Sequence, residues 1–262
     1  MKTSILGTGL SGLVGSRIVE LLSDKFEFED LSLDTGVDIT SREQVTQRVN
    51  NSQAEWILHL AAKTDVDSCE TDKSLGKNGP AWKINVDGTR NIVEAAKETN
   101  KRILYISTDF VFAGDKDTYT EEDTPQPINW YGTTKYEGER IVLTHPDNLI
   151  VRITFPYCAK NPTKHDFVHN IVNLLKKDKK VVAVNDQIFT PTLIDDIALS
   201  LLTLINNKAH GIYHVVGSES LSPYKAAELI AHTFDQSRHL IDGTSAAHYY
   251  QGRAPRPYKL AT

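Results

Sequence analysis

Short runs of apolar residues recur along the chain, and segments with helical spacing separate them. Three of these runs are rich in Ile, Leu and Val, as is typical of strands buried on both faces of a parallel sheet, and they lie at residues 56–62, 102–108 and 149–153. Residues 2–6 predict a shorter strand, and residues 26–34 predict another because apolar and polar side chains alternate there. This order of strands and helical segments predicts an α/β fold with a doubly wound parallel sheet.

The last third of the chain continues the alternation. Residues 191–205 predict a helix, and residues 211–217 predict a strand that returns to the main sheet. Residues 222–230 predict a further helix. Nearer the start of the chain, Thr40 is followed three residues later by Glu43, which predicts a capping box that opens a helix.

Composition narrows the class of protein. The chain has 262 residues, of which 40% are hydrophobic and 24% charged, so we expect a globular protein of one or two domains. A net charge of -5 argues against nucleic acid and anionic membranes as partners. The basic run at residues 176–180 ends a predicted helix and is more typical of a solvated helix end than of a binding patch.

The sequence shows no disulfide framework, no complete metal site and no targeting or membrane-spanning segment. Cys69 and Cys158 form no disulfide framework, and we expect reduced thiols. His165 and His169 stand four apart, but without a matching third ligand we assign no metal site, and the residues do not determine whether Mg²⁺ binds. No signal peptide or run long enough to span a bilayer is found, so we expect a cytoplasmic protein.

A glycine-rich turn follows the first strand directly. Gly9, Gly12 and Gly15 repeat every three residues, and a helical apolar pattern begins at once after them. In this setting glycines let the backbone approach a pyrophosphate at the N-terminus of a helix and let the helix pack closely on the strand. The motif therefore predicts a Rossmann-type dinucleotide site. A phosphate-binding P-loop is excluded, because the required Gly-Lys-Ser/Thr is missing.

The residues that would choose between NAD and NADP conflict. Asp30 lies in the second predicted strand and Asp34 ends it, and either could bind ribose hydroxyls, which favours NAD. Arg17 and Arg42 could instead reach the 2′-phosphate of NADP. The sequence therefore predicts NADP or NAD as the coenzyme, with NADPH slightly preferred.

Tyr131 and Lys135 predict acid–base chemistry. They stand four residues apart in a helical segment, so their side chains share one face. A nearby ammonium favours the phenolate, and we expect Lys135 to lower the pKa of Tyr131. Thr108 ends the strand at residues 102–108, where open α/β sheets bind ligands, and could hydrogen-bond the same substrate oxygen. Asn85 is either a satisfied core amide or part of a proton relay.

Taken together, these motifs resemble the extended short-chain dehydrogenase/reductase superfamily. The resemblance rests on the glycine turn, on the string Ser107 to Gly114 and on Tyr131 with Lys135 and Gly138. Within the superfamily, the segment from Ala61 to Glu70 and the later Asp186, Gln187, Pro191 and Thr192 are most similar to dTDP-4-dehydrorhamnose reductases.

The resemblance implies roles for individual residues. Tyr131 would protonate a sugar C4 carbonyl oxygen, Lys135 would assist Tyr131 and hold the nicotinamide ribose, and Thr108 would polarise the carbonyl. The residues implied to bind the coenzyme are Gly9, Ser11, Gly12, Leu13, Val14, Gly15, Asp38, Ile39, Leu60, Ala61, Ala62, Lys63, Thr64, Tyr131 and Lys135. Those implied to bind the substrate, a nucleotide sugar, are Val66, Asp67, Thr108, Asp109, Phe155, Arg253 and Arg256.

At three of these substrate positions, this sequence either differs from the family or allows an alternative interpretation. Phe155 stands where the family usually has Trp, which keeps an aromatic ring but loses the indole donor. Arg253 and Arg256 match a loop near the substrate diphosphate, although a loose basic tail is the alternative. The family normally continues beyond this point, so the lobe could depend on a partner subunit, and a homodimer is compatible with the sequence. We expect residues 1–157, joined by 191–217, to form the coenzyme domain, and residues 158–190 and 218–262 to form a substrate lobe.

Two other functions fit parts of the pattern. One is an epimerase or dehydratase of the same superfamily, although a sugar dehydratase would want an acidic residue where Phe110 stands. The other is a non-catalytic regulatory subunit resembling the beta subunit of methionine adenosyltransferase. An NAD(P)H-dependent reductase of a nucleotide-linked 4-keto sugar is the main hypothesis.

Overall fold

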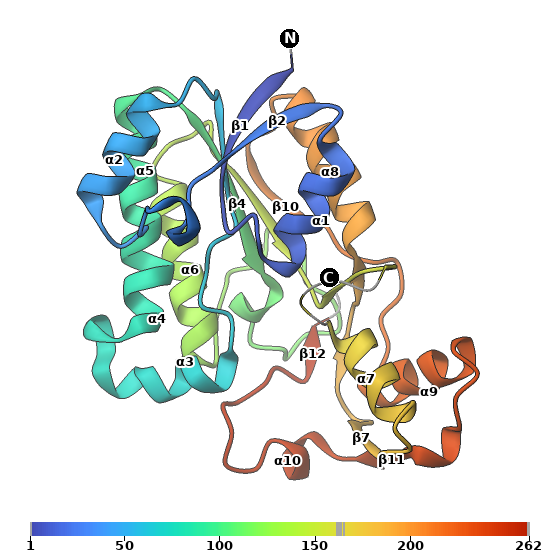
Figure 1. Ribbon diagram of the computed structural model, residues 1–262. Coiled ribbons are helices and arrows are strands. Elements are labelled where there is room, and N and C mark those ends of the chain that lie inside the picture. Colours follow the sequence, from blue (N-terminus) through green and yellow to red (C-terminus); the bar gives the residue numbers. More distant parts are fainter. Residues whose placement is uncertain (1, 161–163, 165, 261–262) are drawn as a thin grey trace.

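A parallel sheet of six strands forms the centre of the protein. The structure is a computed structural model that describes residues 2–160, 164 and 166–260 (Figure 1). All strand pairs in the sheet are parallel, and the strand order is β10-β5-β4-β3-β1-β2. The strands are β1 (Thr3–Thr8), β2 (Phe26–Asp30), β3 (Trp56–His59), β4 (Arg102–Thr108), β5 (Leu149–Ile153) and β10 (Gly211–His214). The predicted Rossmann-type α/β fold is confirmed.

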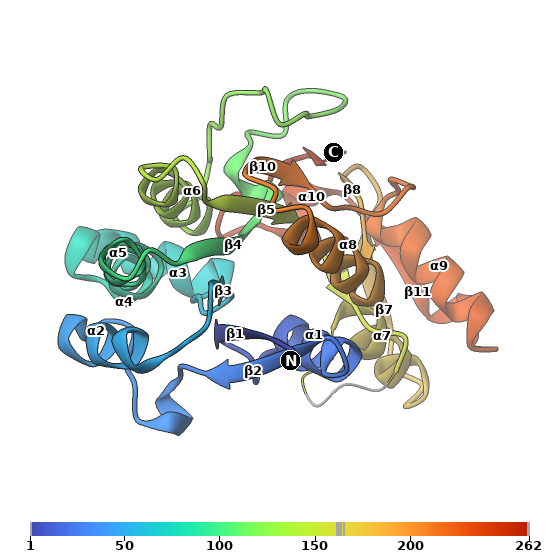
Figure 2. The same cartoon turned by 90° about the horizontal axis from the view of Figure 1, so that it is seen from above.

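Helices cover both faces of this sheet. Viewed from above, α2, α5 and α6 lie on one side, and α1 and α8 lie on the other (Figure 2). Neighbouring residues on a strand point to opposite faces, so Ile57 packs into the core beneath α2 and α5, whereas Leu58 packs into the core beneath α1 and α8. The five helices are α1 (Leu13–Leu22), α2 (Arg42–Asn51), α5 (Thr89–Glu98), α6 (Trp130–Val142) and α8 (Ile194–Asn206).

A smaller lobe lies beyond the carboxyl ends of the strands (Figure 1). It packs α7 (Phe167–Leu175) and α9 (Pro223–Thr233) on the two-stranded sheet of β7 (Val181–Val184) and β11 (Ile241–Thr244). The other elements are α3 (Val66–Asp72), α4 (Pro80–Trp82), β6 (Pro156–Tyr157), β8 (Ile188–Phe189), β9 (Thr192–Leu193), α10 (Ala246–Tyr249) and β12 (Lys259–Leu260). The division into a coenzyme domain and a substrate lobe stays a prediction.

The local predictions differ in outcome. The returning strand is confirmed, since β10 pairs with β5. The predicted second strand is too long, because β2 ends at Asp30 and a 3₁₀ turn (Leu33–Thr35) follows. The capping box is wrong: Ser41 precedes α2 without a side-chain cap, and Thr40 donates to Asp38 instead.

The chain order produces a switch point between β1 and β3. After β1 the chain moves outward to β2, then crosses to the other side of β1 to form β3 and β4. The carboxyl ends of β1 and β3 therefore border a crevice, which is where open α/β sheets bind ligands. None of the helices in the described residues is long and apolar enough to cross a membrane.

Candidate active site

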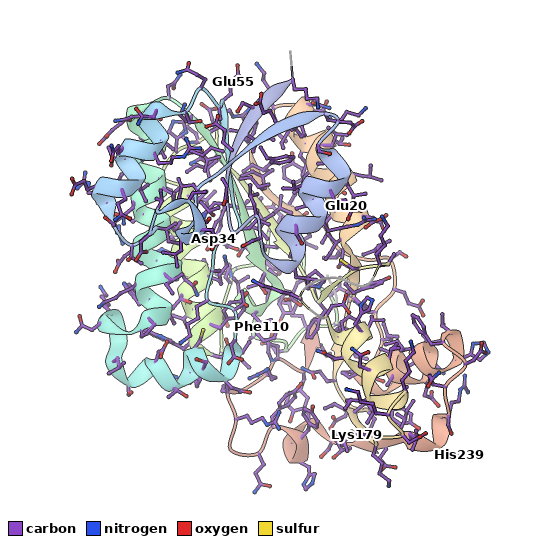
Figure 3. The ribbon with its side chains drawn as sticks, in the orientation of Figure 1. Glu20, Asp34, Glu55, Phe110, Lys179 and His239 are labelled. Atoms are coloured by element: carbon purple, nitrogen blue, oxygen red, sulfur yellow. The ribbon has the colours of Figure 1, made fainter. Side chains whose placement is uncertain are left out.

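A cavity of about 1190 Å³ lies at this switch point. It runs from the glycine turn after β1, past the ends of β3 and β4, to the start of α6 and the segment that follows β5. Figure 3 labels two of its lining residues, Asp34 and Phe110, which come from segments far apart in the sequence. Lys179 and His239, in contrast, lie in the small lobe away from the sheet.

The glycine turn places the first turn of α1 against the cavity. Gly12 precedes α1, and Ser11, Gly12, Leu13 and Gly15 line the cavity. A Cβ atom on Gly15 would lie 2.5 Å from the Gly9 carbonyl oxygen, so only glycine allows this close packing of helix on turn. Unpaired N–H groups at a helix N-terminus attract phosphate, and the residues present fit the pyrophosphate of a dinucleotide.

The far end of the cavity is lined by segments that follow β2 and precede α2. Asp38, Ile39 and Ser32 line it, together with Asp34. Neither arginine considered for a 2′-phosphate lines it. The guanidinium of Arg17 is buried in a bidentate pair with Asp195, with bonds of 2.8 and 2.6 Å.

Arg42 also lies outside the cavity lining and pairs with Glu94 over 3.2 Å. Neither arginine therefore lies in the cavity lining, and the choice between NAD and NADP stays a prediction. Arg17 pairs with Asp195 on α8, which lies 178 residues further along the chain. No local pattern in the sequence indicates this pair.

Tyr131 stands at the start of α6, beside the end of β4. The Asn129 side chain accepts from the Gly132 N–H over 2.8 Å and so begins the helix. A Cβ atom on Gly132 would lie 2.1 Å from the Phe110 carbonyl oxygen, so glycine at this position allows α6 to approach the turn after β4. Tyr131 is buried and its ring contacts that of Phe110 at a centroid distance of 5.8 Å.

Lys135 lies one turn further along α6, in the same cavity lining. Its Nζ donates to the Ile106 carbonyl over 2.8 Å and lies 3.9 Å from the centroid of the Tyr105 ring. Burial lowers the pKa of Lys135 to about 7, and the Glu139 carboxylate acts in the opposite direction. Lys135 therefore changes its charge near neutral pH, unlike an exposed lysine.

The predicted effect of Lys135 on Tyr131 is wrong in this structure. The pKa of Tyr131 is raised, first by burial and then by the nearby Asp109 and Cys69, while a side-chain hydrogen bond with Thr108 lowers it. Lys135 is not among the causes of the Tyr131 pKa shift, and its Nζ is bonded to the Ile106 carbonyl and lies over the Tyr105 ring. At neutral pH Tyr131 is a phenol that keeps a proton to donate.

Thr108 and Asp109 follow β4 and line the cavity next to Tyr131. Thr108 Oγ1 donates to Asp109 Oδ1 over 3.0 Å and accepts from the Phe110 N–H over 3.2 Å. Asp109 is only 2% exposed, and burial raises its pKa to about 6. The sequence indicated Thr108 by its place at a strand end, but no local pattern indicated a buried carboxyl bonded to it.

Asn85 holds the loop after β3 in place. It lies in a π-helical turn (Lys83–Gly88) between α4 and α5, which the helical spacing did not predict. Its Oδ1 accepts from the Lys63 N–H over 2.8 Å, and its Nδ2 donates to the Lys63 carbonyl and to Thr134 Oγ1. The buried amide is thus satisfied by hydrogen bonds, as the core alternative expects, and a relay role stays a prediction.

Phe155 lies under strain in an aromatic cluster beside the cavity. Its φ of 38° falls in the left-handed region, which costs a residue with a side chain roughly 1–2 kcal/mol. Its ring contacts Phe189 at 4.6 Å between centroids and Phe110 at 6.2 Å. Phe155 lines the cavity, so an apolar ring faces it where a Trp was expected from the family.

The segment before β12 lines the end of the cavity opposite Asp38 and Ile39. Arg256 lines it, donates to Asp67 Oδ1 over 3.0 Å and lies over the ring of Tyr250. Asp67 also accepts from the Ala254 N–H over 3.0 Å. Arg253 is exposed, lies over the Tyr249 ring and does not line the cavity.

Most residues implied by the resemblance meet in this one cavity. Those that line it are Gly9, Ser11, Gly12, Leu13, Val14, Gly15, Asp38, Ile39, Leu60, Ala61, Ala62, Thr64, Val66, Thr108, Asp109, Tyr131, Lys135, Phe155 and Arg256. Lys63, Asp67 and Arg253 do not line it. Lys63 is turned away from the cavity because its Nζ pairs with Asp72 over 2.6 Å. Their roles, like those of the lining residues, remain predictions.

Several lining residues have no signal in the sequence. They include Pro80, Lys83, Ile84, Ile106, Lys164 and Tyr250. They line the cavity together with residues from distant parts of the chain, and neither periodicity nor spacing in the sequence encodes that. His165 of the considered metal pair lies outside the described residues. Within the part of the chain that the structure describes, no three His, Cys, Asp or Glu side chains gather to hold a metal ion.

The fold and the cavity together define a class. A glycine turn at the N-terminus of α1 meets a tyrosine, a lysine and a threonine hydroxyl at the carboxyl ends of the strands, as in the short-chain dehydrogenase/reductase superfamily. More narrowly, the chain belongs to the family described as the RmlD substrate binding domain, whose pattern matches residues 1–260.

Individual relatives agree with this family. A dTDP-4-dehydrorhamnose reductase of Aggregatibacter actinomycetemcomitans is 34% identical over 260 residues, which cover 94% of this chain and 85% of the relative. The probable low-salt glycan biosynthesis reductase Agl14 of Haloferax volcanii is 29% identical over 254 residues, 92% of this chain and 83% of that one. A crystal structure of dTDP-4-dehydrorhamnose reductase from Bacillus anthracis in complex with NADP has a TM-score of 0.91 and 32% identity, and the match covers 100% of this chain and 90% of that chain.

Proposed function

We propose that this protein reduces the 4-keto group of a nucleotide-linked deoxysugar of the dTDP-4-dehydrorhamnose type. The observation that carries the proposal is the meeting of the glycine turn with Thr108, Tyr131 and Lys135 in one cavity. Support also comes from relatives that carry the name of this reductase. A bound NADPH or NADH would supply the hydride.

The side chains supply the other parts of the reaction. Tyr131 keeps its proton at neutral pH, since burial raises its pKa, and can donate it to the oxygen of the reduced carbonyl. Lys135, bonded to the Ile106 carbonyl, lies on the same face of α6 and would hold the ribose of the coenzyme. Arg256 would bind the substrate diphosphate once Asp67 gives up part of its pairing.

Oxidation of NADPH and of NADH, measured side by side with a panel of keto-sugar nucleotides, tests the proposal. We expect turnover with dTDP-4-dehydro-6-deoxy-L-mannose, and the two coenzymes will show which is preferred. Absence of turnover while the coenzyme demonstrably binds would contradict the proposal and favour a regulatory, non-catalytic role.

Replacing Tyr131 by Phe removes the proton donor and keeps the ring. Loss of general acid catalysis lowers the rate by ~100-fold or more, so we expect kcat to fall by at least that factor while coenzyme affinity is retained. Tyr136→Phe is the matched control, because it removes a phenol hydroxyl from the same helix outside the cavity lining. Equal effects of the two substitutions would argue against Tyr131 as the donor.

A further inference from the structure

The hydrogen of the Thr108 hydroxyl is already taken by a neighbouring side chain. Its one hydrogen points at Asp109 Oδ1, 3.0 Å from Thr108 Oγ1, and one of its lone pairs accepts from the Phe110 N–H. A hydroxyl offers one donor and two acceptor positions, so only a lone pair is left for a third partner, and the phenol of Tyr131, which is hydrogen-bonded to Thr108, is one such partner. A carbonyl oxygen also only accepts, and therefore Thr108 cannot polarise a substrate carbonyl while Asp109 holds its hydrogen.

Asp109 decides where that hydrogen goes. An ionised carboxylate can only accept a hydrogen bond, so it must take the Thr108 hydrogen. A protonated carboxyl can donate to Thr108 Oγ1 instead. Thr108 would then accept from Asp109 and Phe110, and its hydrogen would be free for an oxygen in the cavity, either that of the substrate or that of Tyr131, to which Thr108 is also bonded.

The surroundings of Asp109 favour the protonated form. Its side chain is 2% exposed, and Oδ2 is buried with no hydrogen-bond partner in the described structure. Burial is the largest influence on its pKa and raises it to about 6. The Thr108 and Thr154 hydroxyls lower that pKa, although Thr154 Oγ1, like Asp109 Oδ2, completes no hydrogen bond.

None of the largest influences on the Asp109 pKa is a positive charge. From α6 Asp109 faces Tyr131, whose pKa it raises, and Cys69 on α3 acts on the same phenol. Thr154 after β5 does not titrate. Lys135 on α6 is bonded to the Ile106 carbonyl and is not among the groups that shift the Asp109 pKa.

We propose that Asp109 is a positioning residue for the reduction: in its protonated form it donates to Thr108 Oγ1, and the Thr108 hydrogen is thereby freed for the substrate carbonyl oxygen. The proton stays on Asp109 throughout, so no further acid or base is required. This inference rests on the proposed function. Anionic ligands in the cavity exclude water and add negative charge, and both raise the Asp109 pKa, so the productive form extends to higher pH in the complex.

The substitution Asp109→Asn tests the inference through the pH profile of kcat/KM. An amide N–H donates to Thr108 at every pH, whereas the wild-type carboxyl stops donating above its pKa. Wild-type kcat/KM should therefore fall about tenfold per pH unit above that pKa, and the Asp109→Asn variant should lack this fall. The ratio of kcat/KM for Asp109→Asn to kcat/KM for the wild type should therefore rise about tenfold per pH unit above that pKa.

A double variant supplies the control. In a Thr108→Val background there is no hydroxyl to orient, so adding Asp109→Asn to that background should change kcat/KM by a factor that is the same at every pH. If the ratio of Asp109→Asn to wild type is constant when Thr108 is present, the proposal is overturned. A rising ratio that persists in the Thr108→Val background would overturn it equally.

An infrared titration of the wild-type protein, with coenzyme bound and no substrate, gives a second readout. The carbonyl band of a protonated carboxyl, assigned by its loss in Asp109→Asn, should appear as the pH falls through the region around and above 6. If the band never appears, the inference fails whatever the activity. If the band appears but no keto-sugar is reduced, the proposed function fails instead, so the two failures are distinguishable.

Discussion

Lys135 shows how one side chain changes its chemistry with its surroundings. In the sequence it is a lysine one helical turn from a tyrosine, which suggested an ammonium that would ionise the phenol. In the fold its Nζ is buried between the Ile106 carbonyl and the Tyr105 ring, and its pKa falls from 10.5 to about 7. The pairing on one helix face was predictable, but the protonation states were not, because desolvation depends on what packs over both groups.

Replacing Lys135 by Met should change how stability depends on pH. Between the folded pKa of about 7 and the ordinary value of 10.5, the unfolded chain binds a proton at Lys135 that the folded protein does not. Wild-type stability should therefore rise with pH in this window by up to ~1.4 kcal/mol per pH unit relative to Lys135→Met. Urea unfolding of both proteins across the window measures this, and a difference that does not change with pH would contradict the lowered pKa.

The junction of β1 and α1 shows what a local pattern can predict. Strand, glycine turn and helix are consecutive in the chain, so their order and spacing could be predicted from the sequence alone. The start of α6 also fits a local reading, with Asn129 as its cap. The predicted capping box at Thr40 was wrong, because the Asp38 carboxylate accepts a hydrogen bond from Thr40 instead. The length of β2 was also mispredicted, because a 3₁₀ turn (Leu33–Thr35) forms where the strand was expected to continue.

Gly15→Ala tests the packing of α1 on the glycine turn. The added Cβ would lie 2.5 Å from the Gly9 carbonyl oxygen, and overpacking of this kind costs roughly 1–3 kcal/mol. We expect a loss of stability in that range in urea unfolding, together with weaker coenzyme binding. Gly12→Ala is the matched control for stability, since a Cβ atom there would lie 3.1 Å from the Gly9 carbonyl oxygen. A loss of stability in Gly12→Ala as large as that in Gly15→Ala would argue against the steric cause.

The substrate end of the cavity exists only in the assembled molecule. Asp67 follows β3, Asn129 precedes α6 and Arg256 precedes β12, yet hydrogen bonds join the first to Arg256 and the second to the Pro255 carbonyl. The C-terminal segment is thereby held against residues that lie 189 and 126 positions earlier in the chain. Arg253 and Arg256 were equivalent in the sequence, and only this packing separates them.

Arg256→Ala should weaken substrate binding and leave the coenzyme unaffected. A hydrogen bond to a charged group contributes ~1.5–3 kcal/mol, so we expect KM for the nucleotide sugar to rise roughly 10- to 100-fold. Arg253→Ala is the control, because its guanidinium lies over the Tyr249 ring outside the cavity lining. Steady-state kinetics and coenzyme titration measure both variants, and a larger effect at Arg253 would contradict the assignment.

Patterns contained within one segment were sufficient for the parallel α/β fold, the glycine turn and the Tyr131 and Lys135 pair, because helix and strand periods act over a few residues. The protonation of Lys135 and Asp109, the pairing of Arg17 with Asp195 and the choice of Arg256 over Arg253 were decided by tertiary packing. Each depends on burial and on partners from distant segments, and electrostatic free energies follow those distances rather than the order of residues in the chain.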